Sequence, residues 1–355
     1  MRPVGIYIHI PFCRTKCLYC DFVSFPYEDD KHINYQQALL QELSNCEELN
    51  DVEIQTIFIG GGTPTVLSPV FLCEILQFLY SKKCAAKTEV TIEANPGTLN
   101  VSMLRALHQS GVNRLSIGLQ AVQGNILQKI GRSHSYENFL ENYNSAVMVG
   151  FNNINVDLMF SLPMQTMDDW HESLEKVIEL NPQHISAYAL TMEEHGVLKP
   201  LDSKTDRQMY YLCKKILKKN GFEHYEISNF AKDGYACRHN IKYWAREEYL
   251  GFGLGAHSFF KGRRFCNTSD LGLYINNNGA VKDGVHILSE KDAMEELIFL
   301  GLRMIRGIPE NALGQNYEET VQKMLKAKLL KRNSGRLSLT AKGLDISNYV
   351  MGAFL

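Results

Sequence analysis

The sequence predicts an α/β protein with a main domain built on a parallel sheet and a smaller, mostly helical domain after it. Two observations support this fold class. Six apolar, β-branched runs alternate with stretches of helical periodicity between residues 4 and 190, and strand–helix units in succession imply a parallel sheet. From about Leu288 the pattern changes to closely spaced helices. A chain of 355 residues is long enough for one large domain and one small domain.

The expected strands are the apolar runs at 4–10, 54–59, 89–94, 114–119, 154–160 and 185–190. The stretches with helical spacing between them are 32–46, 69–82, 101–110, 136–149 and 167–180. In the C-terminal part we expect helices at 291–304, 309–313 and 317–330, a hairpin at 333–340 with glycine at its turn, and a last helix. Because the chemistry of parallel β/α barrels gathers at the carboxyl ends of the strands, the segments that follow the strands are the candidate sites.

Composition excludes several classes of protein. Apolar residues make up 45% and charged residues 21% of the chain, as in ordinary globular proteins. The 37 basic and 39 acidic residues give no electrostatic case for a nucleic-acid partner, and the basic run 214–219 is interpreted as a solvated helix face. No signal segment or transmembrane run is recognised. The nine cysteines, an odd number without a framework pattern, favour a reducing, cytoplasmic location.

Three of these cysteines lie close together after the first expected strand. Cys13, Cys17 and Cys20 have the spacing C-x3-C-x2-C, so their thiols can surround one inorganic centre. A four-iron cluster normally takes four thiolates, and three would leave one iron free to bind a small molecule. A zinc site is the alternative if His9 or a distant residue supplies a fourth ligand. A disulfide with a spare thiol would fit a secreted protein better.

Other strand ends carry polar residues. The second strand is followed by Gly60-Gly61-Gly62-Thr63-Pro64, which allows a close backbone approach to a ligand but also suits a plain turn. No Gly-Lys-Ser/Thr follows it, so it is not a phosphate loop. Glu93 lies at the rim of the third strand, and Gln120 closes the fourth. Asp157 interrupts the apolar fifth strand, where burial is costly without a partner; an ion pair with Arg132 is one structural explanation.

The cysteine spacing, with the aromatic Tyr19 before the last cysteine, resembles the signature of the radical S-adenosylmethionine (SAM) superfamily. The resemblance implies a partial (β/α)6 radical SAM barrel and a [4Fe-4S] cluster held by the three cysteines. It also implies that the open iron chelates SAM, which the reduced cluster cleaves to a deoxyadenosyl radical. The SAM-binding positions that it implies are Tyr7, Tyr19, Gly62, Thr63, Pro64, Glu93, Gln120, Arg132 and Asp157.

Further segments resemble the oxygen-independent coproporphyrinogen III oxidase family: 5–20, 60–64, 113–120, 155–163 and 225–259. Phe22 stands where the true oxidase has a further cysteine, and only six residues precede Tyr7, which leaves no room for the oxidase's N-terminal extension. Both features resemble the haem-chaperone branch of the family. The sequence His239-Asn240-x-x-Tyr243-Trp244 matches the HNxxYW motif of that branch.

The resemblance implies that His239 ligates haem and that the aromatic side chains of the motif cover the macrocycle. Cys237 and His257 are rival ligands. Without the family, a histidine in this setting would be interpreted as a hydrogen-bonded core or rim residue.

We therefore expect a SAM-binding iron–sulfur protein that binds haem and delivers it to acceptor haemoproteins, served by an electron donor for the cluster. The alternative is the oxidase, which decarboxylates coproporphyrinogen III to protoporphyrinogen IX; a radical SAM enzyme with another substrate is a third hypothesis. We expect a core at 1–230, a connecting segment with the motif at 231–287 and a winged-helix-like domain at 288–355. That domain lacks a strong basic concentration, so DNA binding is not expected. The acceptor, the fate of SAM, the covalency of haem and the oligomeric state are left open.

Overall fold

A computed structural model describes residues 1–27, 29–191 and 197–355. Twelve strands form one open sheet in the order β14-β13-β12-β11-β1-β4-β5-β6-β7-β8-β10-β9. The six expected strands lie at its centre and pair in parallel. They are β1 (Arg2–Ile10), β4 (Val52–Gly61), β5 (Cys84–Ala94), β6 (Arg114–Gln120), β7 (Ile154–Phe160) and β8 (His184–Ala189). β1 pairs with β11 on its outer side, so the described strands form a partial barrel, as predicted.

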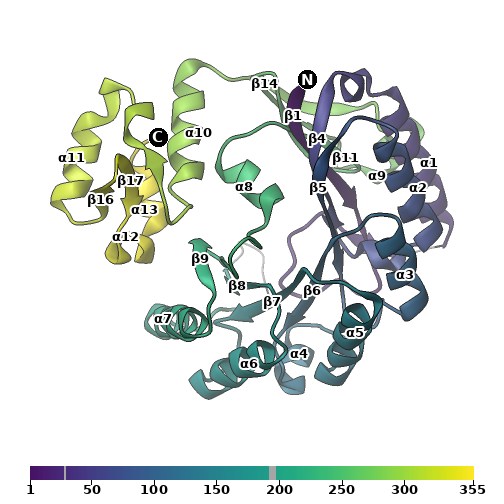
Figure 1. Cartoon of the computed structure of the whole chain (residues 1–355), viewed down its shortest axis with the longest axis horizontal. Coiled ribbons are helices and arrows are strands. Elements are labelled where there is room, and N and C mark those ends of the chain that lie inside the picture. Colours follow the sequence, from purple (N-terminus) through teal and green to yellow (C-terminus); the bar gives the residue numbers. More distant parts are fainter. Residues whose placement is uncertain (28, 192–196) are drawn as a thin grey trace.

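Helices cover the convex face of this sheet (Figure 1). They are α1 (Asp29–Asn45), α2 (Pro69–Tyr80), α3 (Val101–Gln109), α4 (Gly124–Lys129), α5 (Tyr136–Val149), α6 (Met167–Glu179) and α7 (Ser203–Lys219). Side-chain caps begin several of them; Ser135 and Thr166, for example, form capping boxes with Asn138 and Asp169. The basic run 214–219 falls in α7, as its interpretation as a helix face predicted.

The two faces of the sheet differ in polarity. In β5, Val90 and Ile92 belong to the hydrophobic core beneath the outer helices. Glu89, Thr91 and Glu93 alternate with them and therefore face the concave side, because successive side chains of a strand point to opposite faces. The same alternation in β6 and β7 turns Arg114, Ser116, Asn155 and Asp157 inward. We call this polar concave space the lumen.

The segment 231–287 enlarges the sheet at the β1 edge. β11 (Tyr249–Phe252) pairs in parallel with β1, and β12 (His257–Phe260), β13 (Arg263–Asn267) and β14 (Lys282–Ile287) follow in antiparallel order. α9 (Leu271–Asn276) connects the last two. At the other edge, β9 (Glu223–Glu226) and β10 (Asn229–Ala231) extend the sheet beyond β8. α8 (Arg238–Trp244) lies on the concave side (Figure 1).

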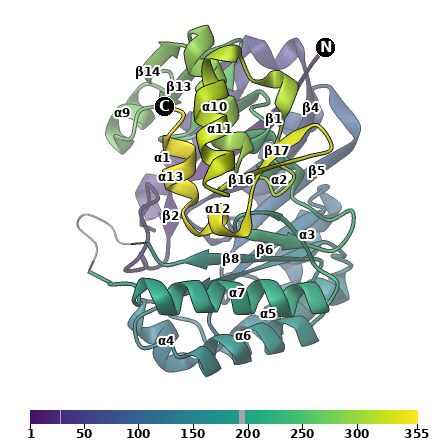
Figure 2. The ribbon, with the colours of Figure 1, turned by 90° about the vertical axis from the view of Figure 1, so that its left-hand side faces the viewer.

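The C-terminal part has a hydrophobic core of its own, with Ile298, Leu302, Met324, Leu337 and Val350 among its buried residues. It lies on the open side of the sheet (Figures 1 and 2). Its elements are α10 (Glu290–Gly301), β15 (Ile308–Pro309), η3 (Glu310–Ala312), η4 (Gln315–Tyr317), α11 (Glu318–Lys326), β16 (Leu330–Asn333), β17 (Arg336–Leu339), α12 (Ala341–Asp345) and α13 (Ser347–Gly352). β15, β17 and β16 form a small antiparallel sheet beside the helices, in keeping with a winged-helix-like arrangement.

Three C-terminal predictions were inaccurate. The helix expected at 317–330 ends at Lys326, because Leu330 already pairs with Leu339 in the hairpin. The helix expected at 309–313 is instead a strand residue and a 3-10 turn, because Ile308 and Pro309 pair with β17. The helix expected at 291–304 ends at Gly301. Beyond it the chain pairs with the end of β9: Ile227 N donates to Arg303 O and Ile305 N donates to Tyr225 O. The hairpin is confirmed, with Ser334 and Gly335 at its turn, both at positive φ.

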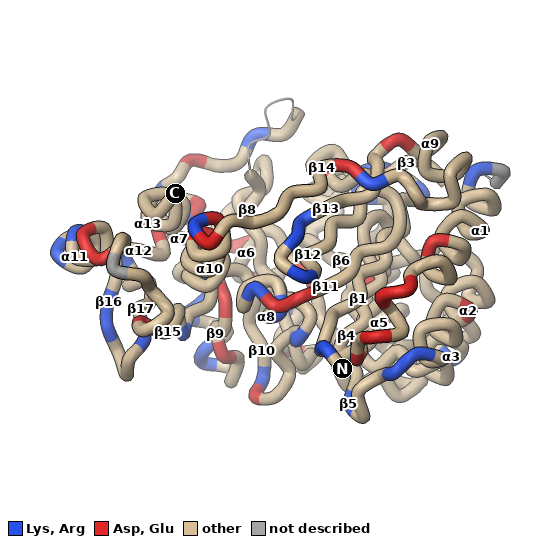
Figure 3. The backbone as a smooth tube through the Cα atoms, turned by 90° about the horizontal axis from the view of Figure 1, so that it is seen from above, with Lys and Arg blue, Asp and Glu red and all other residues tan. Residues whose placement is uncertain are grey.

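Charges of both signs alternate along the barrel and the C-terminal part (Figure 3). This matches the near-balance of acidic and basic residues in the sequence. In the described part of the chain no helix combines the length and apolarity that a membrane crossing needs.

Candidate functional site

The cysteine loop follows β1 and is held at both ends by backbone hydrogen bonds. Phe12–Cys13 (β2) pairs with Phe25–Pro26 (β3), and Tyr27 N donates to Cys13 O at 2.9 Å. Inside the loop Cys20 N donates to Cys17 O at 3.2 Å. The three cysteines are free thiols on one loop at the carboxyl end of the first strand, the place that the sequence predicts.

The donor set fits an iron–sulfur cluster. Burial raises the pKa of Cys13 and of Cys20, and in each the charge of neighbouring loop cysteines acts in the same direction. Thr63 Oγ1 partly opposes this at Cys13 by donating to its Sγ at 3.5 Å. Because the pKa of Cys13 and of Cys20 is raised, these thiols need a nearby cation to become thiolates, and bound iron supplies that charge.

His9, the proposed fourth ligand of a zinc site, is engaged elsewhere. Its Nε2 donates to Val23 O at 2.8 Å, so its Nδ1 accepts from the Tyr7 hydroxyl at 2.9 Å. Burial lowers its pKa. Nor do the described residues contain any group of three or more His, Cys, Asp or Glu side chains placed to hold a single metal ion. The zinc alternative thus has no support from the ligand suggested for it.

The glycine-rich segment lies against the cysteine loop. Gly62 N donates to Ile10 O and Thr63 N donates to Phe12 O, both at 2.8 Å. A Cβ on Gly62 would lie 2.7 Å from Phe12 O, so the close approach excludes other residues. Pro64 then begins the 3-10 turn η2 (Pro64–Val66). The segment therefore fixes Thr63 beside Cys13 whether or not a ligand is bound.

Arg132 links the cysteine loop to the third strand. Its Nε and Nη2 donate to the Tyr19 hydroxyl at 3.0 and 2.6 Å, and its Nη1 donates to Asn95 Oδ1 at 2.5 Å. Asn95 Nδ2 in turn donates to Thr63 Oγ1 at 2.7 Å. Among the described residues Arg132 forms no ion pair with Asp157, so that structural explanation of the two residues is wrong; Arg132 holds Tyr19 instead.

A pocket opens beside this arrangement. Cys17, Thr63, Asn95 and Arg132 line it, together with residues of the segments 14–15, 96–98 and 131–138. A Cβ on Gly118 would come within 2.8 Å of Asn95 Oδ1 and 3.0 Å of Gln120 Nε2, so glycine leaves room for these polar ends to meet. The structure thus brings Cys17, Thr63 and Arg132 of the predicted set to one surface.

The remaining predicted SAM residues face the lumen. Glu93 Oε2 accepts from Gly61 N at 3.0 Å. Burial, with the neighbouring charge of Asp157, raises the pKa of Glu93 to about 7. Asp157 accepts from Asn155 Nδ2 at 2.8 Å and from Ser116 Oγ at 3.2 Å, yet burial still raises its pKa. These hydrogen bonds are the compensation that a carboxylate in an apolar strand requires.

Tyr7 and Gln120 complete the set. Burial raises the pKa of Tyr7, whose ring centroid is 6.0 Å from that of His9 and 6.3 Å from that of Phe58. Gln120 ends β6 at a φ of 72° and is buried. A left-handed conformation is uncommon outside glycine and marks functional or strained positions.

The HNxxYW helix is tied into the lumen by hydrogen bonds. Glu89 Oε2 accepts from Arg238 N at 3.0 Å, and its Oε1 accepts from His239 N at 2.9 Å. The His239 ring is fully buried, with Nδ1 bonded to Thr56 Oγ1 at 2.8 Å and Nε2 to the Tyr243 hydroxyl at 2.7 Å. Burial lowers its pKa to about 3. His239 is therefore neutral, and in this arrangement both ring nitrogens have partners.

The rival haem ligands differ in exposure. Cys237 is buried and its thiol donates to Glu89 Oε1 at 3.7 Å. His257 begins β12 and is exposed. Trp244, the last residue of the motif, lies under Arg303 of the C-terminal part, whose guanidinium carbon is 4.3 Å from a ring centroid.

Sequence reasoning missed several residues of this site. Asn95 bridges Thr63 and Arg132, and Glu89 caps α8. A second chain of hydrogen bonds joins Asn155 Oδ1, the His184 ring and the Tyr225 hydroxyl, which accepts from Cys237 N. Glu89 lies four residues before Glu93 in the same strand, so the alternation of side chains along that strand could have indicated it, whereas Tyr225 and His184 meet only through the fold.

Comparison with known proteins agrees with this geometry. Residues 7–177 match the radical SAM superfamily and residues 288–346 match the HemN C-terminal domain. The chain is 35% identical to heme chaperone HemW of Lactococcus lactis over 100% of this chain and 98% of that protein. It is 36% identical to heme chaperone HemW of Bacillus subtilis over 98% of both chains. The chain belongs to the HemW family. The family's radical SAM domain implies a [4Fe-4S] cluster and SAM, and the thiol set above fits the first of these.

A solved structure shares the fold of this HemW-family chain. Coproporphyrinogen III oxidase (HemN) from Escherichia coli, a radical SAM enzyme, superposes with a TM-score of 0.85. The match covers 99% of this chain and 90% of that one, at 21% sequence identity. At this sequence identity the structural similarity shows only that the two proteins share a fold. The function has to be inferred from the residues of the site.

Proposed function

We propose that this protein is a haem chaperone that binds haem and transfers it to acceptor haemoproteins, with a [4Fe-4S] cluster and SAM as cofactors. The observation that supports this best is a sequence identity of 35–36% over the full length to proteins named heme chaperone HemW. The HNxxYW motif adds to it, because its helix lies on the concave side of the sheet. Phe22, at the position of the oxidase's further cysteine, is 66% exposed and has no thiol; its backbone is hydrogen-bonded to Cys20.

Cys13, Cys17 and Cys20 are the proposed cluster ligands. When bound, a cluster with three thiolates supplies an electron and an open iron position. The proposed SAM-binding residues are those that the resemblance indicated: Tyr7, Tyr19, Gly62, Thr63, Pro64, Glu93, Gln120, Arg132 and Asp157. The carboxylates suit a cationic ligand, Arg132 lines the pocket and holds Tyr19, and the glycines keep the backbone close to the thiols.

His239 is the proposed haem ligand. Ligation requires one ring nitrogen to exchange its protein partner for iron, so Tyr243 or Thr56 must release it. The test is anaerobic haem binding to cluster-loaded His239→Ala and, as a matched control, His257→Ala. We expect the first variant to lose the Soret shift of bound haem and the second to keep it. The reverse pattern would assign the exposed histidine instead.

An assay of reaction products separates the chaperone from the oxidase. Cluster-loaded protein is incubated anaerobically with reductant, SAM and coproporphyrinogen III, and in parallel haem-loaded protein is mixed with an apo-haemoprotein. We expect the acceptor to gain the spectrum of its holo form and no vinyl-bearing porphyrinogen to appear. Formation of protoporphyrinogen IX, without haem transfer, would establish the oxidase instead.

A further inference from the structure

Two neighbouring hydrogen-bond donors in the lumen have no acceptor. Arg114 begins β6 and Thr91 lies in β5, and the two are paired in register. Both face the lumen, because Val90, Ile92 and Leu115 beside them belong to the outer core. Arg114 is 2% and Thr91 0% exposed. The Nε of Arg114 and the Oγ1 of Thr91 are both buried without a hydrogen-bond partner in the described part of the chain.

Such donors are costly unless something accepts from them. A buried polar group without a hydrogen-bond partner destabilises the fold, and more so when it is charged. The nearby carboxylates do not meet this need. Glu89 uses both oxygens on the N-terminus of α8, and Asp157 accepts from Asn155 and Ser116. Arg114 forms no ion pair with any described carboxylate, so its fork of donors is available to a ligand.

The charged groups around Arg114 and Thr91 indicate which chemical class of ligand the two donors can bind. The ionisable groups that interact with the charge of Arg114 include Glu89, Glu93, Asp157, Tyr225, Cys237 and the rings of His184 and His239. Both histidines are neutral, because burial lowers their pKa and the Arg114 charge adds to the effect. Among these groups Arg114 is the cation; Lys242, whose charge also acts on His239, is already paired with Glu247. Guanidinium binds carboxylates through two parallel hydrogen bonds.

We propose that Arg114 and Thr91 form a binding site for a carboxylate side arm of the macrocycle that His239 ligates. This inference rests on the proposed haem binding and deepens it. His239 and Arg114 face the same part of the lumen, so a ligand that carries both a metal centre and carboxylate arms can reach both. In the present arrangement α8 covers Arg114, and entry requires the N-terminus of α8 to leave Glu89.

The test compares haem with haem dimethyl ester, whose two carboxylates are blocked. Dissociation constants are measured by Soret titration of the full, cluster-loaded chain under anaerobic conditions. We expect the wild type to bind haem at least about tenfold more tightly than the ester, because a charge-assisted pair is worth more than 1.4 kcal/mol, which is tenfold in affinity. Arg114→Met should lose this discrimination and bind the two ligands equally.

Further variants strengthen the comparison. Thr91→Val should reduce the discrimination severalfold, and Arg114→Lys should keep part of it because the charge stays. Arg105→Met, which removes an exposed arginine from α3, should leave the ratio unchanged. Iron content and thermal unfolding identify a variant that fails to fold.

The outcomes are distinguishable. If the wild type binds haem and the ester with equal affinity, the carboxylate site is overturned, and water rather than a ligand satisfies the two donors. This comparison uses the wild-type protein alone. Discrimination that persists in a folded Arg114→Met protein overturns it as well. Failure of the wild type to bind either ligand overturns the proposed function itself.

Discussion

Glu93 is a carboxyl group whose charge depends strongly on its surroundings. Burial and Asp157 raise its pKa to about 7 from an ordinary value of 4.5. The folded chain therefore holds a proton that the unfolded chain has lost, and the contribution of Glu93 to stability is present below about pH 4.5 and lost as the pH rises through 7. A cationic ligand would favour the ionised form.

This predicts a pH-dependent affinity for SAM. If Glu93 contacts SAM, the affinity of cluster-loaded protein should rise about tenfold from pH 6 to pH 8, as the ionised fraction increases around a pKa near 7. Glu93→Gln should weaken binding and flatten the profile. Glu53→Gln, on the same sheet but paired with Lys83 at the surface, should keep it. Equilibrium dialysis at the two pH values measures this, and a flat wild-type profile would contradict the role.

Cys17 provides a second prediction at this scale. Three thiolates leave no spare ligand, so Cys17→Ala should lose most of its iron and the visible absorption of the cluster after anaerobic reconstitution. Cys266→Ala, which removes a partly buried thiol of β13 that lies outside the loop, should retain both. Iron and sulfide analysis of the two variants decides the matter; a wild-type content in Cys17→Ala would exclude this ligand set.

The contacts of single residues were harder to predict than their positions. The spacing of Cys13, Cys17 and Cys20 placed them on one loop, and the structure agrees. For Arg132 the sequence suggested Asp157 as a partner, whereas the structure joins it to Tyr19 and Asn95. The reason is that side-chain partners come from strand register, which local sequence does not contain.

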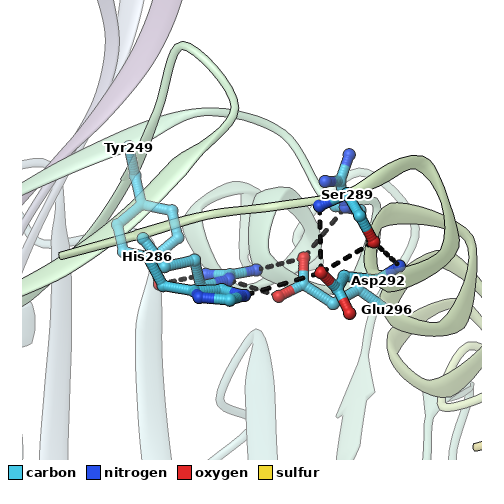
Figure 4. Close-up of polar contacts among 7 residues, drawn as sticks. Tyr249, His286, Ser289, Asp292 and Glu296 are labelled. Carbon is cyan, nitrogen blue, oxygen red and sulfur yellow. Dashed lines mark hydrogen bonds and ion pairs between the residues drawn. The ribbon is translucent and has the colours of Figure 1, made fainter. Parts of the chain in front are cut away.

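At the scale of elements, a cluster of charges joins the sheet to the C-terminal part. Glu296 of α10 accepts from Arg264 Nε and Nη2 at 2.6 and 3.0 Å and from Arg246 Nε at 2.9 Å. Arg264 Nη1 also donates to the Tyr249 hydroxyl at 3.0 Å. Figure 4 shows Glu296 and Asp292 of α10 together with His286 of β14 and Tyr249 of β11. Burial opposes ionisation of Glu296, but the two arginines outweigh it and lower its pKa.

Glu296→Gln should therefore destabilise the protein by about 1–3 kcal/mol at neutral pH, because two charge-assisted contacts are lost. The difference should shrink as the pH falls through about 4.5, where the unfolded carboxyl takes up a proton. Glu295→Gln, which breaks an i,i+4 pair with the exposed Lys291, should cost less than about 0.5 kcal/mol. Urea unfolding of the three proteins measures the difference; equal losses in both variants would show that the cluster adds nothing.

Most elements of the barrel follow from periodicity. All six predicted central strands are present, and their helices begin within a few residues of the expected positions. The four strands β11–β14 were not predicted, because they are short and alternate with glycines rather than forming apolar runs. The helix expected at 309–313 failed for a related reason, since pairing of Ile308 with Leu337 overrides local preference.

At the scale of the whole molecule, the HNxxYW helix connects two hydrophobic cores. Its first residues are bound by Glu89 of the barrel, and Trp244 at its end packs against Arg303. Arg303 also pairs with Glu226 at 3.6 Å. Movement of the C-terminal part is thereby linked to the helix that carries His239.

We expect Trp244→Ala to loosen this link. Loss of the Arg303–indole contact, worth about 0.5–2 kcal/mol, should increase hydrogen exchange in α8 and α10 while the central strands stay protected. Tyr349→Ala, at an exposed position of α13, is the matched control and should leave exchange in α8 unchanged. Uniform protection in Trp244→Ala would mean that the two cores are not joined through the indole.

The proposed function depends on haem binding by the cluster-loaded chain. The most direct measurement is an anaerobic titration of that protein with haem, followed through the Soret band. We predict a saturable shift at one haem per chain that is lost in His239→Ala. A spectrum identical to that of free haem at every ratio would contradict the assignment.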